Sequence, residues 1–356
     1  MTTVLFDAHQ LGGGQTGNET YVRGLLGGLR AVGGVSVIAA VEGGQESTGI
    51  LAPPFRLRRV PANGFARLAS LAMIARQVRP DLLHAIYFLP PAVGRPTVLT
   101  IHDISFEFFP EFFSRRSLIR DRVLIRNSAH RATKVVTISE TSRRDIIDRY
   151  GLAPDRVVAI HLGVAPSFSP GADPTERPPL DGRPLRLLAV GALQPRKNLI
   201  RLLEAVRIIG RDIPVLLRIV GPDGFQANEI RARLAGSAEM EVVGYVADEA
   251  LAGLYRWADM LVYPSIYEGF GLPVIEAMAC GTPVVTSTGG SLPEVAGDAA
   301  IIVDPRDVTA IANGIRQVAE APVLADSMRA RGLARAAEFT WEATAQRQLE
   351  VYEELA

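Results

Sequence analysis

Short apolar runs of strand length alternate along most of the chain with longer stretches whose apolar residues recur at helical spacing. Such alternation of strands and helices is typical of α/β proteins with parallel sheets. In the first half of the chain the pattern predicts strands at residues 4–6, 35–40, 55–60, 82–85, 97–101, 134–138 and 157–160. It predicts helices at residues 19–30, 67–78, 115–129 and 141–150, the last with Ser139 as its N-cap.

The alternation stops between residues 165 and 184, where six prolines and two glycines in twenty residues prevent both helix and central strand. It then resumes, and predicts strands at residues 185–190, 215–220, 241–243, 260–262, 283–286 and 301–303. Helices are predicted at residues 198–210, 227–234, 248–258 and 273–279, and over most of the chain from residue 308. The chain is therefore expected to form two doubly wound domains, residues 1–168 and 185–340, joined by a linker at 169–184.

Composition limits the class of protein further. At 356 residues, with 48% apolar and 21% charged residues, the chain is expected to be a soluble two-domain protein. Lys+Arg and Asp+Glu are both 38, so the net charge of zero argues against a nucleic-acid partner. The single cysteine, Cys280, is interpreted as a small buried side chain in a reducing compartment. We expect no signal peptide and no membrane-spanning segment, and therefore a cytoplasmic location.

Two carboxylates, Glu268 and Glu276, are separated by seven residues and lie between a predicted strand and a predicted helix. Pro273 suits the first turn of that helix, so Glu268 should lie on the loop and Glu276 about one turn inside the helix, facing the loop. Two acids beside the free N–H groups of a helix start suit a ligand with hydroxyl and phosphate groups. The alternative is a solvated acid followed by a capping acid. The connecting residues that would line the pocket are Gly269, Phe270, Gly271 and Leu272.

Arg196 and Lys197 follow the predicted strand 185–190 and open the next helix. Cations are unfavourable at a helix N-terminus unless an anion binds there. The arginine fork and the lysine point charge together could hold a diphosphate and stabilise it as a leaving group, in place of a metal ion. The alternative is a pair of solvated charges.

Two features of the first domain are weaker signals. In the segment 11–17, Gly12, Gly14 and Gly17 match a dinucleotide-binding spacing, but the acid expected about 20 residues later is not clearly placed. Together with Gly13, these glycines could let the backbone approach a ligand, or they could form a plain flexible loop. His102 follows the predicted strand 97–101 and could donate to a sugar hydroxyl or a developing charge, or it could simply pack.

Five phenylalanines crowd a segment predicted to be a loop, residues 106–113. They could line an acceptor site, anchor the protein to a membrane face, or form a small buried core. The residues are Phe106, Phe108, Phe109, Phe112 and Phe113.

With these motifs, nearly the whole chain resembles the retaining glycosyltransferase family 4, whose GT-B architecture has two facing Rossmann-like domains. The most specific matches are the pair Glu268 and Glu276, the turn Arg196-Lys197-Asn198, and the segment from Tyr263 to Ser265. The segments 291–295 and 102–106 are most similar to bacterial mannosyltransferases of that family. The resemblance implies that a C-terminal helix, residues 341–356, crosses back to the first domain.

The resemblance also implies roles for the residues. Arg196 and Lys197 would bind the diphosphate of a nucleotide-sugar donor, Glu276 the ribose hydroxyls, and Glu268 the transferred hexose. His102 would face the donor sugar, Gly13–Gly17 would lie near the diphosphate or the acceptor, and Glu294 near the base or ribose.

The function expected from this resemblance is transfer of a hexose, with mannose as the first choice, from a nucleoside-diphosphate sugar to a hydroxyl acceptor with retention of configuration. The acceptor would be a glycan, a lipid-linked saccharide or a small glycoside. No cluster has metal-ligand spacing, so no metal cofactor is expected. Two alternatives stay open: a sugar-nucleotide epimerase of the same fold, and a non-catalytic sugar-nucleotide-binding subunit. Contact with the inner face of a membrane also stays open.

Overall fold

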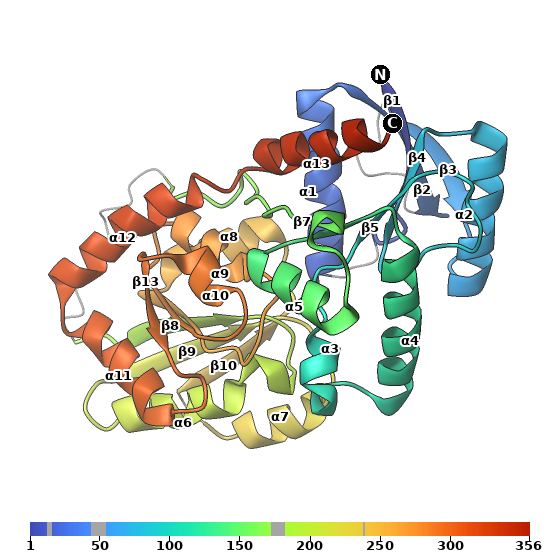
Figure 1. Ribbon diagram of the computed structural model, residues 1–356. Coiled ribbons are helices and arrows are strands. Elements are labelled where there is room, and N and C mark those ends of the chain that lie inside the picture. Colours follow the sequence, from blue (N-terminus) through green and yellow to red (C-terminus); the bar gives the residue numbers. More distant parts are fainter. Residues whose placement is uncertain (13–15, 44–54, 172–181, 238) are drawn as a thin grey trace. The chain divides into compact units, whose positions relative to one another are not determined.

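A computed structural model describes residues 1–12, 16–43, 55–171, 182–237 and 239–356 of the protein (Figure 1). The chain divides into two compact units. Unit 1 comprises residues 1–107, 115–163 and 340–356, and unit 2 comprises residues 108–114 and 164–339. Residues 172–181, most of the predicted linker, lie outside the described part of the chain.

Unit 1 contains a seven-stranded sheet in the order β3-β2-β1-β4-β5-β6-β7, in which every neighbouring pair is parallel. The central strands are buried almost throughout, as expected when helices cover both faces of a parallel sheet. The strands are β1 Thr2–Asp7, β2 Val35–Glu42, β3 Arg56–Val60, β4 Leu82–Ile86, β5 Thr97–Thr100, β6 Lys134–Thr137 and β7 Val157–Ala159.

Helices α2 and α5 of unit 1 each begin where a polar side chain caps them. Asn63 accepts hydrogen bonds from the N–H groups of Phe65 and Ala66, so α2 begins at Gly64, three residues before the predicted start. Ser139 accepts from the N–H of Ser142, which confirms the predicted cap of α5. The helices are α1 Thr16–Val32, α2 Gly64–Val78, α4 Arg115–Arg131, α5 Glu140–Tyr150 and α13 Trp341–Leu355.

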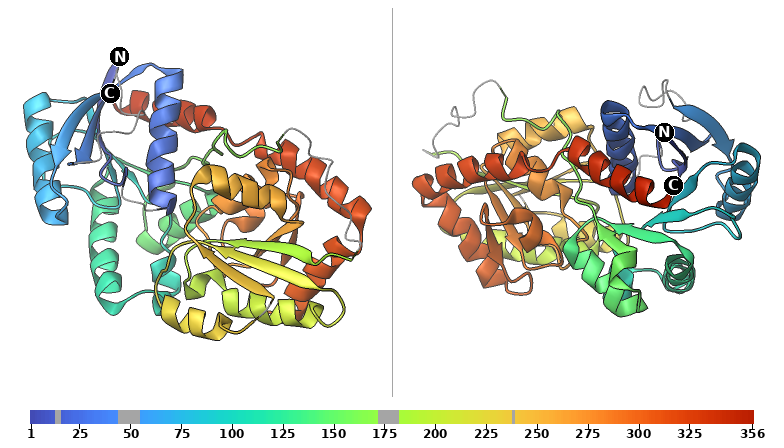
Figure 2. Two further views of the ribbon diagram at one scale, coloured as in Figure 1. Left: turned by 180° about the vertical axis from the view of Figure 1, so that it is seen from behind. Right: turned by 45° about the horizontal axis from the view of Figure 1, so that its top comes forward.

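The C-terminal helix α13 packs along α1 (Figure 2). Trp341 lies against two glycines of α1. An added Cβ at Gly24 would be 2.0 Å from the Trp341 indole, and one at Gly28 would be 2.2 Å from the Trp341 carbonyl oxygen. Close approach of the two helices therefore requires glycine at both positions.

Unit 2 contains a six-stranded parallel sheet in the order β10-β9-β8-β11-β12-β13. Helices α6 and α7 lie on one side of it and α8 and α9 on the other (Figure 1). The strands are β8 Leu185–Val190, β9 Val215–Val220, β10 Met240–Gly244, β11 Met260–Tyr263, β12 Val284–Ser287 and β13 Ala300–Val303. The helices are α6 Leu199–Ile209, α7 Ala227–Leu234, α8 Asp248–Trp257, α9 Leu272–Ala279, α10 Leu292–Ala296, α11 Val308–Ala319 and α12 Pro322–Ala336.

The core of unit 2 lies between its sheet and the helices. Leu187, Leu217 and Val262 from the sheet pack with Leu202 of α6 and Ile311 of α11, and all five are fully buried. Cys280 is also buried, with 2% of its surface exposed, as predicted.

Both sheets confirm the predicted doubly wound α/β class. In unit 2 the strand order reverses between β8 and β11, so the loops after these two strands diverge and leave room for a ligand at the carboxyl edge. Arg196 and Lys197 lie on the first of these loops and Glu268 on the second.

One local prediction was wrong, and one short helix was missed. Residues 106–113 do not form a simple loop, because Ser105–Phe108 make a helical turn, α3, and Pro110–Phe112 a 3₁₀ turn. Residues 292–296, where no element was predicted, form the short helix α10, which contains Glu294. Elements this short carry too few residues to show a hydrophobic period.

Within the described ranges, every helix is too short or too polar to cross a bilayer.

Candidate active site

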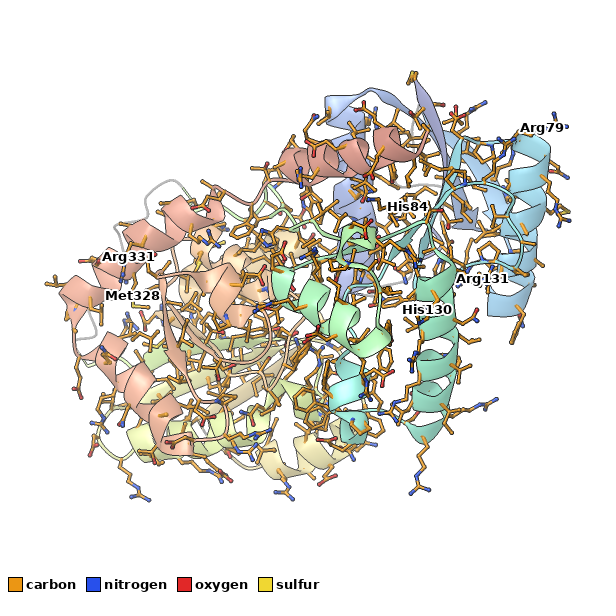
Figure 3. All side chains as sticks on the ribbon, in the orientation of Figure 1. Arg79, His84, His130, Arg131, Met328 and Arg331 are labelled. Carbon is orange, nitrogen blue, oxygen red and sulfur yellow. The ribbon has the colours of Figure 1, made fainter. Side chains whose placement is uncertain are left out.

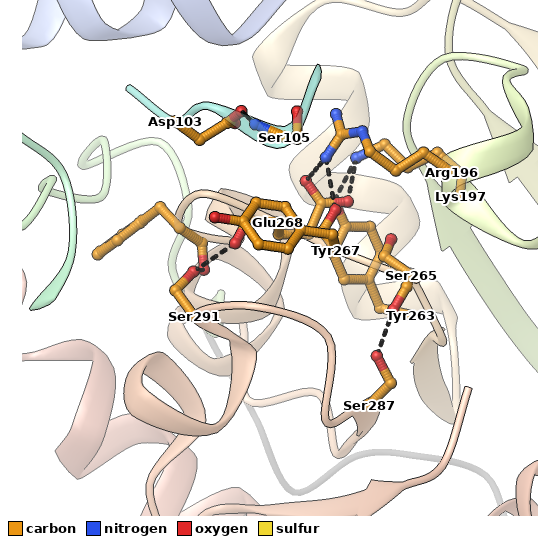
Figure 4. A network of polar contacts seen from close by, with 11 residues as sticks. Asp103, Ser105, Arg196, Lys197, Tyr263, Ser265, Tyr267, Glu268, Ser287 and Ser291 are labelled. Atoms are coloured by element: carbon orange, nitrogen blue, oxygen red, sulfur yellow. Dashed lines mark hydrogen bonds and ion pairs between the residues drawn. The ribbon is translucent and has the colours of Figure 1, made fainter. Parts of the chain in front are cut away.

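Three charged side chains from two loops meet at the carboxyl edge of the sheet of unit 2 (Figure 4). Arg196 Nη1 donates to Glu268 Oε2 at 2.7 Å, and Lys197 Nζ donates to Glu268 Oε1, also at 2.7 Å. Tyr263 lies in the same cluster, because its hydroxyl donates to Glu268 Oε1 at 3.0 Å and accepts from Lys197 Nζ. The two cations are therefore held side by side by one carboxylate.

The loop after β8 is shaped by Asn198. Pro195–Lys197 form a 3₁₀ turn that ends at Asn198, whose φ of 60° lies in the left-handed region that asparagine tolerates. The Asn198 side-chain amide donates to the carbonyl oxygens of Pro264 at 2.9 Å and Pro305 at 2.6 Å. One buried asparagine thus ties three loops together and fixes the direction of the two preceding cations.

A glycine makes room for the lysine stem. Gly191 has a φ of 137°, and an added Cβ there would lie 2.7 Å from Lys197 Cε. The aliphatic part of Lys197 therefore crosses directly over the Gly191 backbone, which a larger residue would block.

Burial and the two cations act on Glu268 in opposite directions. Burial by itself would raise the pKa of Glu268, but the charges of Arg196 and Lys197, with the hydrogen bond from Lys197, lower that pKa to about 2. The carboxylate is therefore ionised at neutral pH and neutralises one of the two positive charges.

The loop that carries Glu268 is fastened by the segment after β12. Ser291 Oγ donates to the carbonyl oxygens of Glu268 at 3.0 Å and Phe270 at 2.9 Å (Figure 4). Gly290, with a φ of 64°, forms an isolated parallel bridge to Glu268, and an added Cβ would lie 2.3 Å from the Glu268 carbonyl oxygen. This contact fixes the backbone from which the carboxylate projects.

Glu276 lies in the second turn of α9, as predicted, and is 7% exposed. Tyr255 of α8 donates its hydroxyl to Glu276 Oε2 at 2.8 Å. Burial raises the pKa of Glu276 to about 7, although the bond from Tyr255 opposes the rise. Glu276 therefore changes its charge near neutral pH, whereas Glu268 does not.

The residues between the two carboxylates point in different directions. Phe270 packs edge-on against Phe339 and is 2% exposed, so its side chain belongs to the core of unit 2. Gly271 caps α9 with a φ of 105°, and Leu272, half-buried, is the first residue of that helix. Arg196 and Lys197 have side chains only 17% and 11% exposed, so the alternative of two solvated charges does not describe them.

His102 belongs to unit 1, where it follows β5 and is 7% exposed. Its Nδ1 lies 2.8 Å from Asn18 Oδ1 of α1, and the rings of Tyr21 and Tyr87 meet it edge-on. Burial lowers the pKa of His102 to about 4, although nearby Asp103 opposes this effect, so the imidazole is neutral at pH 7. Its Nε2 has no hydrogen-bond partner among the described residues.

The predicted glycine loop is only partly described. Gly13 and Gly14 lie outside the described residues, and Gly17 lies in the first turn of α1, which begins at Thr16. An added Cβ at Gly17 would meet nothing within 4 Å, so packing does not require glycine there.

The phenylalanines of residues 106–113 divide between the two units. Phe106 is buried in unit 1, with 5% of its surface exposed. In unit 2, Phe109 and Phe112 stack on each other with ring centroids 5.7 Å apart, and Phe108 is 43% exposed.

In the part of the chain that the structure describes, no group of three His, Cys, Asp or Glu side chains is arranged to hold a metal ion.

The sequence does not reveal the partners of the predicted site residues. Neither Tyr255 nor Asn18 was predicted to belong to a site. Tyr263 and Ser291 lie in motifs that match the family, but no contact was predicted for either. A signal existed for the two tyrosines, since a tyrosine in an apolar strand or helix needs a partner for its buried hydroxyl. No local signal identifies which carboxylate each hydroxyl meets.

The parallel sheets and the site at the switch point define a glycosyltransferase of the GT-B fold. The family model "Glycosyltransferase Family 4" matches residues 16–168, and "Glycosyl transferases group 1" matches residues 175–335. The chain belongs to this glycosyltransferase family, which confirms the resemblance.

Two relatives are mannosyltransferases. The chain is 35% identical over 265 residues to O-antigen chain mannosyltransferase B of Escherichia coli, an alignment that covers 72% of this chain and 69% of the relative. It is 30% identical over 279 residues to MMP alpha-(1->4)-mannosyltransferase of Mycolicibacterium hassiacum, covering 73% and 66%.

Two solved structures share the fold over the full chain. Sucrose-phosphate synthase from Thermosynechococcus elongatus has a TM-score of 0.80 at 23% identity and is covered to 99%, with 100% of this chain aligned. Anabaena HepE in complex with UDP and glucose has a TM-score of 0.73 at 21% identity, with both chains covered to 100%.

Proposed function

We propose that this glycosyltransferase moves a hexose, mannose by preference, from a nucleoside-diphosphate sugar to a hydroxyl acceptor with retention of anomeric configuration. The preference for mannose is supported by the mannosyltransferases named among the relatives. The nucleotide-sugar donor is supported by the structural neighbour that holds UDP and glucose. The acceptor would be a glycan, a lipid-linked saccharide or a small glycoside.

The observation that carries the proposal is the convergence of Arg196 and Lys197 on Glu268 at the strand-order reversal of unit 2. Two cations held by one carboxylate leave one net positive charge, in a site that is mostly shielded from water. A diphosphate that binds there would receive charge-assisted hydrogen bonds from the arginine fork and from the ammonium. Because these groups are already in place, little reorganisation is required when negative charge develops on the leaving group.

The proposed reaction follows from these charges. The bond between the anomeric carbon and the diphosphate oxygen breaks, and its electron pair goes to that oxygen, which Arg196 and Lys197 stabilise. The acceptor oxygen forms the new bond on the face that the diphosphate leaves, and its proton passes to the departing diphosphate. Attack on the same face retains the anomeric configuration. Glu268 would contact the hexose, and His102 of unit 1 would contact the donor sugar. The reaction needs no metal ion in this scheme.

Glu276 would hold the ribose hydroxyls. Only the ionised carboxylate can accept a hydrogen bond from each of two hydroxyls without offering a proton of its own. Because its pKa is raised to about 7 by burial, donor affinity should fall as the pH drops below this value.

We also propose that the enzyme works in the cytoplasm at the inner face of a membrane. Helix α4 supports this proposal, since Ile119 and Val123, 67% and 61% exposed, lie one turn apart on it. Arg116 and Arg120, both exposed, share that face at the same spacing. Exposed apolar side chains among arginines suit a surface of anionic lipid headgroups.

In a sedimentation assay, phosphatidylglycerol vesicles should retain the protein and phosphatidylcholine vesicles should not. The double variant Ile119→Ser/Val123→Ser should lose retention, while Met73→Ser, at another exposed apolar position, should keep it.

A donor panel tests the proposed activity. GDP-mannose, UDP-glucose, dTDP-glucose and ADP-glucose are each incubated with the full chain, with and without a mannoside acceptor, and products are resolved by NMR. We expect transfer only with the acceptor present, an α-linked product from an α-linked donor, and the highest rate with GDP-mannose. Conversion of the donor sugar without any acceptor would identify an epimerase instead. Binding without turnover under all conditions would favour a non-catalytic subunit.

A further inference from the structure

Asn18 and His102 are brought together in unit 1 from positions 84 residues apart. The contact joins Asn18 Oδ1 to His102 Nδ1 at 2.8 Å. A side-chain amide oxygen can only accept a hydrogen bond, so the hydrogen between the two atoms must belong to Nδ1. In a neutral imidazole only one nitrogen carries a hydrogen, so Nε2 has an available lone pair.

The ring of His102 is also fixed in orientation. Tyr21, one turn after Asn18 on α1, meets the His102 ring edge-on with centroids 4.7 Å apart. The Tyr21 hydroxyl is bonded to Thr100 Oγ1 at 2.8 Å, and the Thr137 hydroxyl donates to the His102 carbonyl oxygen at 3.2 Å. The ring therefore has little freedom to rotate or to exchange its two nitrogens.

This support extends to the C-terminal helix. His84 of β4 uses both ring nitrogens, with Nε2 bonded to Thr100 Oγ1 at 2.7 Å and Nδ1 to the Tyr352 hydroxyl at 2.5 Å. The His84 side chain (labelled in Figure 3) links β4 of the sheet to Tyr352 of α13. Tyr352, His84, Thr100 and Tyr21 thus form a continuous buried chain of hydrogen bonds from α13 to the residue that packs on His102.

We propose that Asn18 is a positioning residue that holds His102 in the tautomer with hydrogen on Nδ1, so that Nε2 accepts a hydrogen bond from a hydroxyl of the donor sugar. This inference rests on the proposed nucleotide-sugar donor for the identity of the ligand, but not for the tautomer. It changes the expectation from the sequence, in which His102 donates to the sugar.

The surroundings of His102 agree with a neutral acceptor. The titratable groups that face it are Asp103, His84 and the two tyrosines Tyr21 and Tyr87. Burial lowers the pKa of His102 to about 4 and that of His84 to about 3, so neither ring is charged at neutral pH. Nε2 is buried and has no hydrogen-bond partner among the described residues, so a hydroxyl that reaches it would meet no competing proton.

The tautomer can be measured without any substrate. The full chain is labelled with ¹⁵N-histidine, and its five histidines are observed by long-range ¹H–¹⁵N correlation, with His102 assigned through His102→Gln. We expect a protonated Nδ1 and an unprotonated Nε2 at pH 7, with no titration down to about pH 5. A His102 signal with hydrogen on Nε2 would overturn the inference, whatever the enzyme transfers.

Three variants separate positioning from mere structure. Asn18→Ala should mix the two tautomers and lower kcat/KM for the donor on the order of tenfold. Asn18→Asp keeps an acceptor for Nδ1–H, so the tautomer should be rescued, but its negative charge should raise the pKa of His102. Its activity should therefore approach the wild-type value at pH 8 and decline toward pH 6, where the wild type shows no decline due to His102. Asn127→Ala, at an exposed position of α4, is the matched control and should change neither property.

The sugar contact is tested separately. Saturating GDP-mannose should shift the His102 Nε2 resonance, and GDP alone should not, because only the sugar carries the hydroxyl in question. An unchanged Nε2 resonance with bound GDP-mannose would overturn the acceptor role. Failure of every nucleotide sugar to bind would instead overturn the proposed donor, and the tautomer measurement would still decide the role of Asn18.

Discussion

Lys197 Nζ lies 2.7 Å from Glu268 Oε1, and Lys197 is one of only two lysines in the chain. The other is Lys134, and the remaining 36 of the 38 cationic residues, 38 minus two, are arginines. A compact ammonium fits between Glu268 and the Tyr263 hydroxyl while its stem crosses Gly191. A planar guanidinium requires more room, so a lysine at this position has a steric reason as well as an electrostatic one.

Replacing Lys197 should therefore weaken donor binding even when the charge is kept. Lys197→Ala should reduce nucleoside-diphosphate affinity about tenfold to a hundredfold, which corresponds to a charge-assisted contact of about 1.5–3 kcal/mol. Lys197→Arg should lose a similar amount because it does not fit over Gly191. Isothermal titration with GDP and UDP measures both affinities. Lys134→Arg, which keeps its charge near Glu354, is the matched control, and equal affinities in all variants would contradict the assignment.

Gly290→Ala should impair donor binding through the backbone of Glu268. Its φ of 64° is unfavourable for alanine, and the new methyl would lie 2.3 Å from the Glu268 carbonyl oxygen. Gly253→Ala is the control, since an added Cβ there meets nothing within 4 Å, and alanine should stabilise α8 by up to about 1 kcal/mol. Thermal unfolding and nucleotide titration give both readouts. If Gly290→Ala does not fold, Ser291→Ala removes the same support more gently, and undiminished affinity in that variant would count against the proposed link.

Glu276→Gln should stabilise the protein much more at pH 8 than at pH 5. Folding raises the pKa of Glu276 from an ordinary 4.5 to about 7, so its contribution to stability is full below pH 4.5 and is lost as the pH rises through about 7. The difference of 2.5 units, 7 minus 4.5, corresponds to roughly 3 kcal/mol at high pH. Glutamine keeps an acceptor for Tyr255 and never ionises. Urea unfolding at both pH values measures the effect, with the exposed Glu229→Gln as control. A gain of equal size at both pH values would show that ionisation is not its cause.

Transfer should continue in excess EDTA. The charges of Arg196 and Lys197 already oppose the charge that develops on the diphosphate, so a divalent cation is not needed for this purpose. Initial rates are compared before and after chelation and after addition of magnesium or manganese. A loss of activity that either metal restores would reveal a metal requirement that this site does not explain.

Much of the fold was predicted from the chain itself, because strands and helices of this class have local periodic patterns. The run at residues 185–190 and the helix at residues 227–234 have the predicted bounds. Strand order was not predicted, since it depends on which strand edges hydrogen-bond to each other once the chain has folded. That order places the loops after β8 and β11 at the reversal of the sheet of unit 2.

Sequence alone identified the charged residues of the site, because an acid pair around a strand–helix turn and two cations at a helix start are unusual patterns. Only the tertiary structure determined their partners and their charge states. Glu268 and Glu276 have the same side chain, yet pairing with cations lowers the pKa of the first and burial raises that of the second. Likewise, His102 was recognised from its place after a strand, but its tautomer depends on Asn18, 84 residues away. Residue type is local in the sequence, whereas hydrogen-bond partners and burial arise from segments that meet only in the folded chain.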